Sequence, residues 1–362
     1  HTAHIRSVRG SIPCTATSIC KGPVPDRAFA HPSRKQKMVE PFSPAAWARS
    51  AHIQTIVSRL RLRVAGKNEM VDAAQETIVD AGNGGRLLGY HSTQTGRTPQ
   101  GLIILIHGWE GSADSTYILS TGRFFYRQGY DIFRLNLWDH GKSHHLNRGL
   151  FHGAMTEETA QAVANVARRL PDQPCYLIGF SLGGNFALRI ALRQSVSPIP
   201  NLKSVFCVSP ALDPLQSTLA IDAGPSIYRR YFLAKWKRSL RQKQRCFPDL
   251  YQFDAILHHG TCMALTEAIM PWYTEFGHYR NYFRRYTLTG NVLAPLAMPV
   301  TIFTAADDPV VSAEEFHHLP RNPYLNLSIQ RYGGHCGFLD PFPCGCWYER
   351  SIGEILDREE ER

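Results

Sequence analysis

The sequence predicts an α/β fold in which a mostly parallel central sheet is flanked by helices on both faces. Two observations lead to this prediction: short, almost wholly apolar runs recur along the chain, and longer segments with helical periodicity separate them. Apolar runs of this kind are typical of parallel strands that are buried on both faces. The chain has 362 residues, of which 43% are hydrophobic and 19% charged. That length and composition suit one large domain with insertions, or two small domains.

The expected elements follow in chain order. After a helical patch within 41–60, the segments 76–80 and 86–90 flank a Gly-Asn-Gly-Gly turn and are predicted to pair as a hairpin. The buried strands are expected at 101–106, 130–137, 175–178, 202–208, 300–305 and 325–331. The helices between them are expected at 115–128, 157–170 and 182–194, with a closing helix around 349–356.

One motif carries a specific chemistry. Gly-Phe-Ser-Leu-Gly at 179–183 matches the G-x-S-x-G pattern of a nucleophile elbow, with an apolar strand before it and a helix after it. Small residues are needed beside the serine because the turn from strand to helix is tight. The serine oxygen then lies at a helix N-terminus, where a developing negative charge is stabilised. We therefore expect Ser181 to be a catalytic nucleophile on an α/β-hydrolase fold; the alternative is a glycine-rich turn with an exposed serine.

The partners of the serine are expected in a fixed chain order, an acid before a histidine. Asp307 and Asp308 follow one expected strand and His335 follows the next, and such strand ends gather active-site groups in open α/β sheets. His335 would take the proton of Ser181 and return it to the leaving alcohol. Asp308, which Pro-Val-Val follows, is favoured as the acid that orients the histidine, and Asp307 is the alternative.

An oxyanion site is expected beside the serine. Ile-His-Gly-Trp-Glu-Gly at 106–111 follows an earlier buried strand, where this fold places its second oxyanion donor. The backbone N–H groups of Trp109 and Leu182 are the candidate donors. The alternative interpretation of 106–111 is a turn that only ends the strand.

Charge and composition exclude several other classes of function. The net charge is +10, but no zinc-finger spacing, aromatic RNA-binding pattern or long basic run supports nucleic-acid binding. Histidines cluster within 140–152, yet none falls in a metal-ligand pattern, so we expect no metal or cofactor and place these histidines at the surface. Nine scattered cysteines favour a reducing compartment. No long apolar segment or signal-peptide pattern occurs, so the expected location is the cytoplasm.

Domain organisation is expected as follows. Residues 1–39 lack periodicity and are predicted to be a disordered tail; Met38 is a candidate natural first residue, in which case the tail would not belong to the natural protein. Residues 40–362 would form one α/β-hydrolase domain, with a helical cap inserted at about 212–293. The basic, aromatic stretch 228–245 has two interpretations. It is either an amphipathic cap helix that covers the pocket with Phe232, Leu233 and Trp236 and turns its Lys and Arg to solvent, or a peripheral contact with an anionic membrane.

Several further motifs resemble those of the AB hydrolase 4 family, the YheT-like α/β hydrolases. The matching segments are Ser-Ala-His-Ile-Gln-Thr at 50–55, His-Gly-Trp-Glu-Gly at 107–111, Trp-Asp-His-Gly at 138–141, Gly-Phe-Ser-Leu-Gly-Gly-Asn at 179–185 and Gly-Gly-His-Cys-Gly-Phe at 333–338. The resemblance implies a triad of Ser181, Asp308 and His335, no cofactor, and activity on carboxylic esters, which in eukaryotic members include glycerolipids and phospholipids. Those eukaryotic members often carry an N-terminal membrane anchor. No apolar segment of that kind occurs in this sequence, so we expect a soluble, bacterial-type member.

The sequence thus predicts a serine esterase that works through an acyl-enzyme intermediate on a small-molecule or lipid ester. Two alternatives stay open: transfer of the acyl group to an alcohol instead of water, and a non-enzymatic binding protein on a hydrolase scaffold. The preferred ester depends on how the segment 212–293 folds over the pocket, and the oligomeric state is not predicted.

Overall fold

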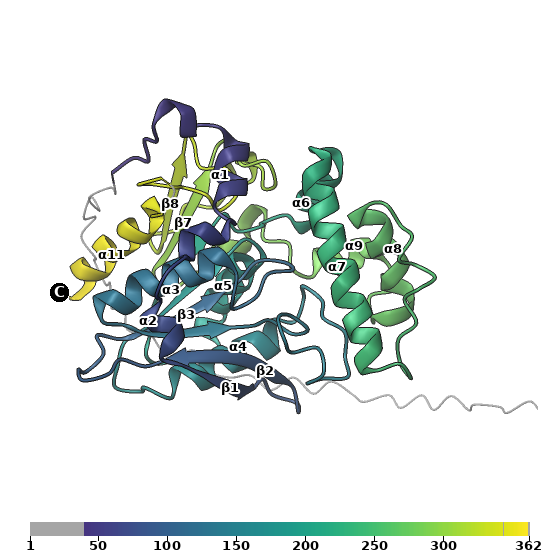
Figure 1. The fold of residues 1–362 in the computed structure, drawn as a ribbon, viewed down its shortest axis with the longest axis horizontal. Helices are drawn as coiled ribbons and strands as arrows, with labels where there is room; N and C mark the ends of the chain where they lie inside the picture. The colour runs from purple at the N-terminus through teal and green to yellow at the C-terminus, as the bar shows by residue number, and fades with distance from the viewer. Residues whose placement is uncertain (1–39, 343, 361–362) are drawn as a thin grey trace, which may run out of the picture. The chain divides into compact units, whose positions relative to one another are not determined.

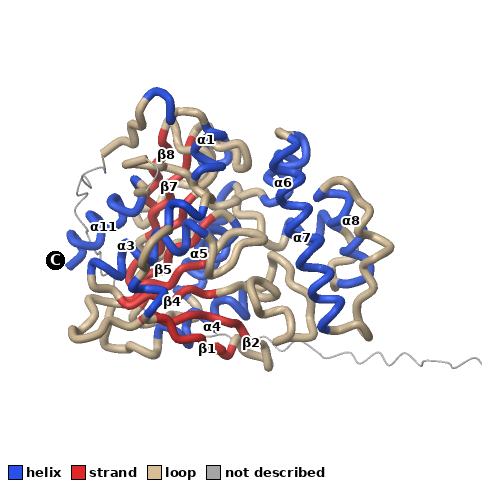
Figure 2. The backbone as a smooth tube through the Cα atoms, in the orientation of Figure 1, coloured by secondary structure: helices blue, strands red, loops and turns tan. Residues whose placement is uncertain are grey.

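The computed structural model describes residues 40–342 and 344–360, and its centre is an eight-stranded sheet (Figures 1 and 2). The predicted N-terminal tail, residues 1–39, lies outside the described residues. The strands are β1 (Ala74–Asp80), β2 (Arg86–Ser92), β3 (Leu102–Ile106), β4 (Asp131–Leu135), β5 (Cys175–Phe180), β6 (Leu202–Val208), β7 (Val300–Ala305) and β8 (Leu325–Gln330).

The order of strands in the sheet is β1-β2-β4-β3-β5-β6-β7-β8. β1 and β2 form the predicted antiparallel hairpin, and β2 also pairs antiparallel with β4. All other neighbours, from β4 to β8, are parallel. The predicted mostly parallel sheet is therefore confirmed.

Helices cover both faces of this sheet. They are α1 (Ala51–Val57), α2 (Glu69–Asp72), α3 (Thr116–Gln128), α4 (Thr156–Ala167), α5 (Leu182–Leu192), α6 (Pro214–Ala223), α7 (Ser226–Cys246), α8 (Cys262–Tyr273), α9 (Tyr279–Arg284), α10 (Glu314–His317) and α11 (Trp347–Glu360), with short 3-10 turns that include η2 (Arg61–Val64). Successive side chains of β3 point to opposite faces. Ile104 belongs to the core that α4 and α5 complete, and Ile103 belongs to the core that α3 and α11 complete.

The segment between β6 and β7 interrupts the alternation of strands and helices. It holds α6, α7, α8 and α9, which Figure 1 shows grouped together beside the sheet. The insertion falls within the interval 212–293 that the sequence indicated. Phe232, Leu233 and Leu240 of α7 are buried in the same core as the α4 and α5 face of the sheet. The insertion therefore packs onto the domain through its apolar side.

The length and hydropathy of a helix decide whether it can cross a bilayer. At 21 residues α7 is the longest of those listed above, but its sequence is rich in Lys and Arg. No helix in residues 40–342 and 344–360 combines the length and the apolar character that a membrane span needs.

Candidate active site

Ser181 lies in a sharp turn between β5 and α5. Its φ is +53°, in the left-handed region that non-glycine residues seldom adopt. The flanking glycines make this turn possible: a Cβ on Gly179 would lie 2.3 Å from the carbonyl oxygen of Gly183, and a Cβ on Gly183 would lie 2.4 Å from that of Ile106. Both distances are far below any real contact. The sequence therefore folds here only with glycine at both positions, and the serine is held at the N-terminus of α5.

A chain of two hydrogen bonds connects Ser181 with the loops that follow β7 and β8. The Oγ of Ser181 lies 3.0 Å from Nε2 of His335, and Nδ1 of His335 lies 2.9 Å from Oδ2 of Asp308. Because a carboxylate can only accept, Nδ1 carries the proton and Nε2 is free to accept from the serine hydroxyl. The side chains of His335 and Asp308 are 2% and 0% exposed. The three side chains are thus aligned for proton transfer from serine to imidazole.

The two adjacent acids have different contacts. The second oxygen of Asp308, Oδ1, accepts from the backbone N–H groups of Val310 and Val311 at 2.8 and 3.0 Å, which fixes the carboxylate in place. Asp307 instead accepts from the N–H of Gly334 at 2.9 Å, and partial burial raises its pKa. Of the two candidates for the acid, only Asp308 is within hydrogen-bond distance of the histidine in the described structure.

Helix α1 supports the loop that carries the histidine. Thr55 Oγ1 accepts from the N–H of His335 at 2.9 Å, and the buried amide of Gln54 accepts from the N–H of Leu339 at 2.8 Å. A Cβ on Gly334 would lie 2.3 Å from the carbonyl oxygen of Ala51, so only glycine lets the helix approach this closely. The segment Ser-Ala-His-Ile-Gln-Thr at 50–55, which the sequence singled out without a role, thus positions His335 through the backbone.

The two candidate oxyanion donors lie beside the serine. Leu182 is the first residue of α5, where backbone N–H groups have no partner within the helix. Within residues 40–342 and 344–360, the N–H groups of Leu182 and Trp109 donate no hydrogen bond to the protein. Both residues line the same cavity as Ser181. These two N–H groups are therefore available to a substrate oxygen.

Two buried histidines hold the turn that carries Trp109. Nε2 of His107 accepts from the N–H of Leu137 at 3.1 Å, and its Nδ1 is 2.8 Å from the carbonyl oxygen of Gly108. Nε2 of His140 accepts from the N–H of Glu110 at 3.2 Å. Burial lowers the pKa of His107 to about 4 and that of His140 well below its usual value. Both rings are therefore neutral at physiological pH, each with one donor and one acceptor in use.

The expectation that the histidines of the 140–152 segment lie at the surface is wrong for His140 and His144, which are 3% and 8% exposed. It is confirmed for His145, which is exposed. No periodic pattern predicts this burial, because the residues occupy a loop that packs against the turn at 107–111 and α7. In the described residues, no three His, Cys, Asp or Glu side chains are grouped as they would be around a metal ion.

An apolar cavity opens from the serine towards the inserted helices. Its volume is about 90 Å³, and α6, α7, α8 and α9 all contribute to its wall. Its lining includes Trp109, Leu182, Ile221, Phe232, Trp236, Ile269, Met270, Phe283, Tyr286 and Val310. Two of the three α7 residues that the sequence placed over the pocket, Phe232 and Trp236, line this cavity, whereas Leu233 is buried in the core.

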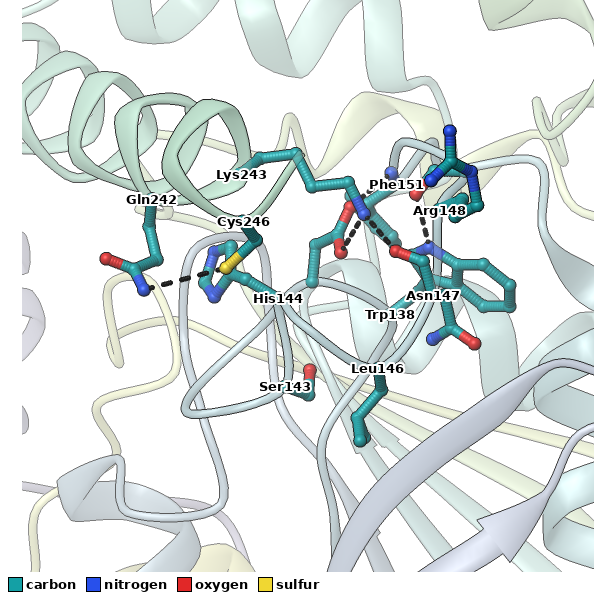
Figure 3. A network of polar contacts seen from close by, with 12 residues as sticks. Trp138, Ser143, His144, Leu146, Asn147, Arg148, Phe151, Gln242, Lys243 and Cys246 are labelled. Carbon is teal, nitrogen blue, oxygen red and sulfur yellow. Dashed lines mark hydrogen bonds and ion pairs between the residues drawn. The ribbon is translucent and has the colours of Figure 1, made fainter. Parts of the chain in front are cut away.

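Figure 3 shows how α7 is fastened to the loop after β4. Nζ of Lys243 donates to Oδ1 of Asp139 at 2.8 Å and to the carbonyl oxygen of Asn147 at 2.7 Å. One helical turn earlier, Ser239 Oγ lies 2.8 Å from Nε2 of His144. The Lys243 and Asp139 side chains are 1% and 3% exposed. The expectation that the Lys and Arg side chains of this helix face solvent is therefore wrong for Lys243, which is buried because Asp139 neutralises it.

The chain is similar to several known proteins. A model of the alpha/beta hydrolase fold matches residues 101–235. Human protein ABHD15 is 24% identical over an alignment that covers 96% of this chain and 74% of that protein. The monoacylglycerol lipase of Saccharomyces cerevisiae is 21% identical over 269 residues, which cover 70% of this chain and 58% of the lipase. The crystal structure of 2,6-dihydroxy-pseudo-oxynicotine hydrolase shares the fold with a TM-score of 0.52, at 18% identity, over 78% of this chain and 67% of that one.

Proposed function

Because the chain belongs to the α/β-hydrolase family, we propose that it is a serine hydrolase that cleaves carboxylic esters. The observation that carries the proposal is the hydrogen-bonded series Ser181–His335–Asp308, with distances of 3.0 and 2.9 Å. A serine joined in this way to a buried, carboxylate-oriented imidazole is activated for attack on a carbonyl carbon.

The mechanism follows from these contacts. As Ser181 Oγ attacks the ester carbonyl, its proton passes to Nε2 of His335, and Asp308 stabilises the imidazolium that forms. The N–H groups of Trp109 and Leu182 are placed to donate to the carbonyl oxygen as it becomes an oxyanion. His335 then protonates the leaving alcohol, and the acyl group stays on Ser181. Water then gives a proton to His335 and attacks the acyl-enzyme. The bond between the acyl carbon and Ser181 Oγ breaks, His335 returns the proton to Ser181 Oγ, and the acid is released.

The apolar cavity supports a place for the acyl part of the substrate on the side of the inserted helices. Its wall is formed largely by α6 to α9, so we assign this segment the role of a cap over an acyl-binding pocket. Apolar lining favours an acyl chain longer than acetyl, because each buried methylene group contributes about 0.8 kcal/mol to binding. The name of the yeast relative, a monoacylglycerol lipase, agrees with a lipid-like acyl group.

The proposal is tested with a fluorophosphonate probe, which labels only activated serines. We expect stoichiometric labelling of the wild-type protein at Ser181, and none in Ser181→Ala. Ser209, whose backbone also has a positive φ, of +46°, serves as the matched control because its side chain accepts from the N–H of Cys336, whereas the His335 ring bonds to Ser181 and Asp308. Ser209→Ala should still be labelled. Folded wild-type protein that takes up no probe would contradict the proposal.

A further inference from the structure

A second cavity also reaches the nucleophile. Its volume is about 310 Å³, and Ser181 and His335 form part of its wall. It shares only Trp109, Ser181 and Phe232 with the apolar cavity. The two cavities therefore meet at the nucleophile. If the acyl chain occupies the apolar one, the alcohol part of an ester extends into the second.

The wall of the second cavity carries three cationic side chains. They are Arg59 after α1, Arg61 at the start of η2 and Lys235 of α7. Within the described part of the chain, none of the three forms an ion pair with a carboxylate. Lys235 Nζ donates to the backbone oxygen of Glu110 at 3.0 Å, and the Arg59 guanidinium lies 5.2 Å from the ring centre of Tyr231. Both contacts orient a cation without neutralising it.

Two carboxyl groups share this wall, and neither cancels its charge. Asp114 is paired with the buried guanidinium of Arg134 at 3.0 Å. Burial raises the pKa of Glu110 to about 8, although nearby Lys235 opposes the shift. Glu110 is therefore largely protonated at neutral pH. The cavity keeps a positive charge.

Helix α3 adds a further positive contribution. Its N-cap residue Ser115 and its first residues, Thr116 and Tyr117, line the same cavity. The first turn of this 13-residue helix holds no acidic residue that would offset the positive end of its dipole. A helix N-terminus together with arginine side chains is an arrangement that binds phosphate and carboxylate groups.

We propose that this cavity is a subsite for an oxyanion, a phosphate or a carboxylate, carried by the alcohol part of the ester. The inference rests on the proposed function, because it names the substrate class of the same serine. In the reaction, the bond between the carbonyl carbon and the alcohol oxygen breaks, the acyl carbon becomes bonded to Ser181 Oγ, and the alcohol leaves into the basic cavity with a proton from His335. The anionic alcohol stays paired with Arg59 and Arg61 until release.

The experiment compares esters that have the same octanoyl group. The substrates are 1-octanoyl-glycerol, 1-octanoyl-glycerol 3-phosphate and the octanoyl ester of glycolate, and kcat/KM is measured for each at low ionic strength. We expect at least tenfold higher kcat/KM for one or both anionic esters than for the glycerol ester. The phosphate and carboxylate substrates show which oxyanion the subsite prefers. In Arg59→Gln/Arg61→Gln this ratio should fall at least tenfold, whereas Arg241→Gln, an exposed charge on α7 outside both cavities, should keep the wild-type ratio.

A measurement on the wild-type protein does not depend on the folding of the variants. Glycerol 3-phosphate should inhibit hydrolysis of 1-octanoyl-glycerol competitively, and glycerol at the same concentration should not. Salt at 0.5 M should lower the preference for the anionic esters, because it screens the exposed cations. Hydrolysis of 1-octanoyl-glycerol with no anionic preference and no inhibition would overturn the oxyanion subsite alone. No hydrolysis of any ester, with no labelling of Ser181, would overturn the proposed function instead.

Discussion

Replacing Lys243 with methionine measures the cost of burying Asp139 without its cation. The two side chains are 1% and 3% exposed, so water screens the pair little. Burial raises the pKa of Asp139 to about 6 even in the presence of Lys243, which opposes the shift. Without the ammonium group the pKa of Asp139 rises further. The folded variant then keeps this carboxyl group protonated at neutral pH.

The size of the effect follows from the proton balance. Unfolded chains release the Asp139 proton above the ordinary pKa of 3.8, whereas the folded wild type releases it above about pH 6 and the folded variant at a higher pH. Above pH 6 the folded wild type has released this proton, as the unfolded chain has, but the folded variant still binds it. The free energy of unfolding of the variant therefore falls by about 1.4 kcal/mol per pH unit relative to wild type. Loss of the hydrogen bond to the Asn147 carbonyl adds roughly 1–3 kcal/mol at every pH. We expect a loss of roughly 2–4 kcal/mol at pH 7.

Urea unfolding at pH 5.5, 7 and 8, followed by tryptophan fluorescence, measures this difference. Arg241→Met, an exposed position on the same helix, is the matched control and should change the free energy of unfolding by less than about 0.5 kcal/mol. The double variant Asp139→Asn/Lys243→Met should lose the extra pH dependence, since position 139 then carries no carboxyl group. A Lys243→Met effect that is the same at pH 5.5 and pH 8 would refute the reasoning.

Three further predictions concern the site. Asp308→Asn should lower kcat by about 10³–10⁴-fold, because the imidazolium loses its counter-charge. Asp307 contacts only a backbone N–H, so Asp307→Asn should lower kcat less than tenfold. Equal losses of kcat for the two variants in steady-state assays would contradict the choice of Asp308 as the acid. His107, with a pKa lowered to about 4, resists protonation that the unfolded chain accepts below about pH 6.5, so wild-type stability should fall as pH drops through that window, by up to about 3 kcal/mol. In His107→Gln that part of the pH dependence should vanish from urea titrations, and an unchanged profile would count against a buried neutral ring. Met270→Trp should fill the apolar cavity and lower kcat/KM for an octanoyl ester at least tenfold. The kcat/KM for the acetyl ester should change less than threefold. An equal loss for both esters would contradict the acyl-binding role of the apolar cavity.

The strands were predictable from sequence because parallel strands buried on both faces leave uninterrupted apolar runs. The run at 202–208 coincides with β6 and the run at 300–305 with β7, and the remaining strand boundaries differ by one to two residues. The turn at Ser181 was predictable for a local reason. Gly179 and Gly183 are required by contacts that arise within a few residues of the serine and at the end of one neighbouring strand.

Contacts between distant segments were not predictable from the same patterns. Lys243 and Asp139 are separated by 104 residues, and nothing in the amphipathic period of α7 distinguishes Lys243 from the lysines and arginines that face water. In the sequence His140 likewise resembles any other loop residue. In the structure it is buried and accepts a hydrogen bond from the N–H of Glu110, 30 residues earlier. The basic cavity brings Arg59 and Arg61 together with Lys235 from a distant segment, so its charge is apparent only once the chain is folded.

The central claim is that Ser181 carries the acyl group during turnover. Rapid acid quenching of the wild-type protein with an excess of 4-nitrophenyl octanoate, followed by peptide mass spectrometry, tests it directly. The proposal predicts a burst of 4-nitrophenol of about one equivalent and an octanoyl group on the peptide that contains Ser181, with neither in Ser181→Ala. Turnover of the ester by Ser181→Ala at the wild-type rate, or an octanoyl group found on another residue, would contradict it.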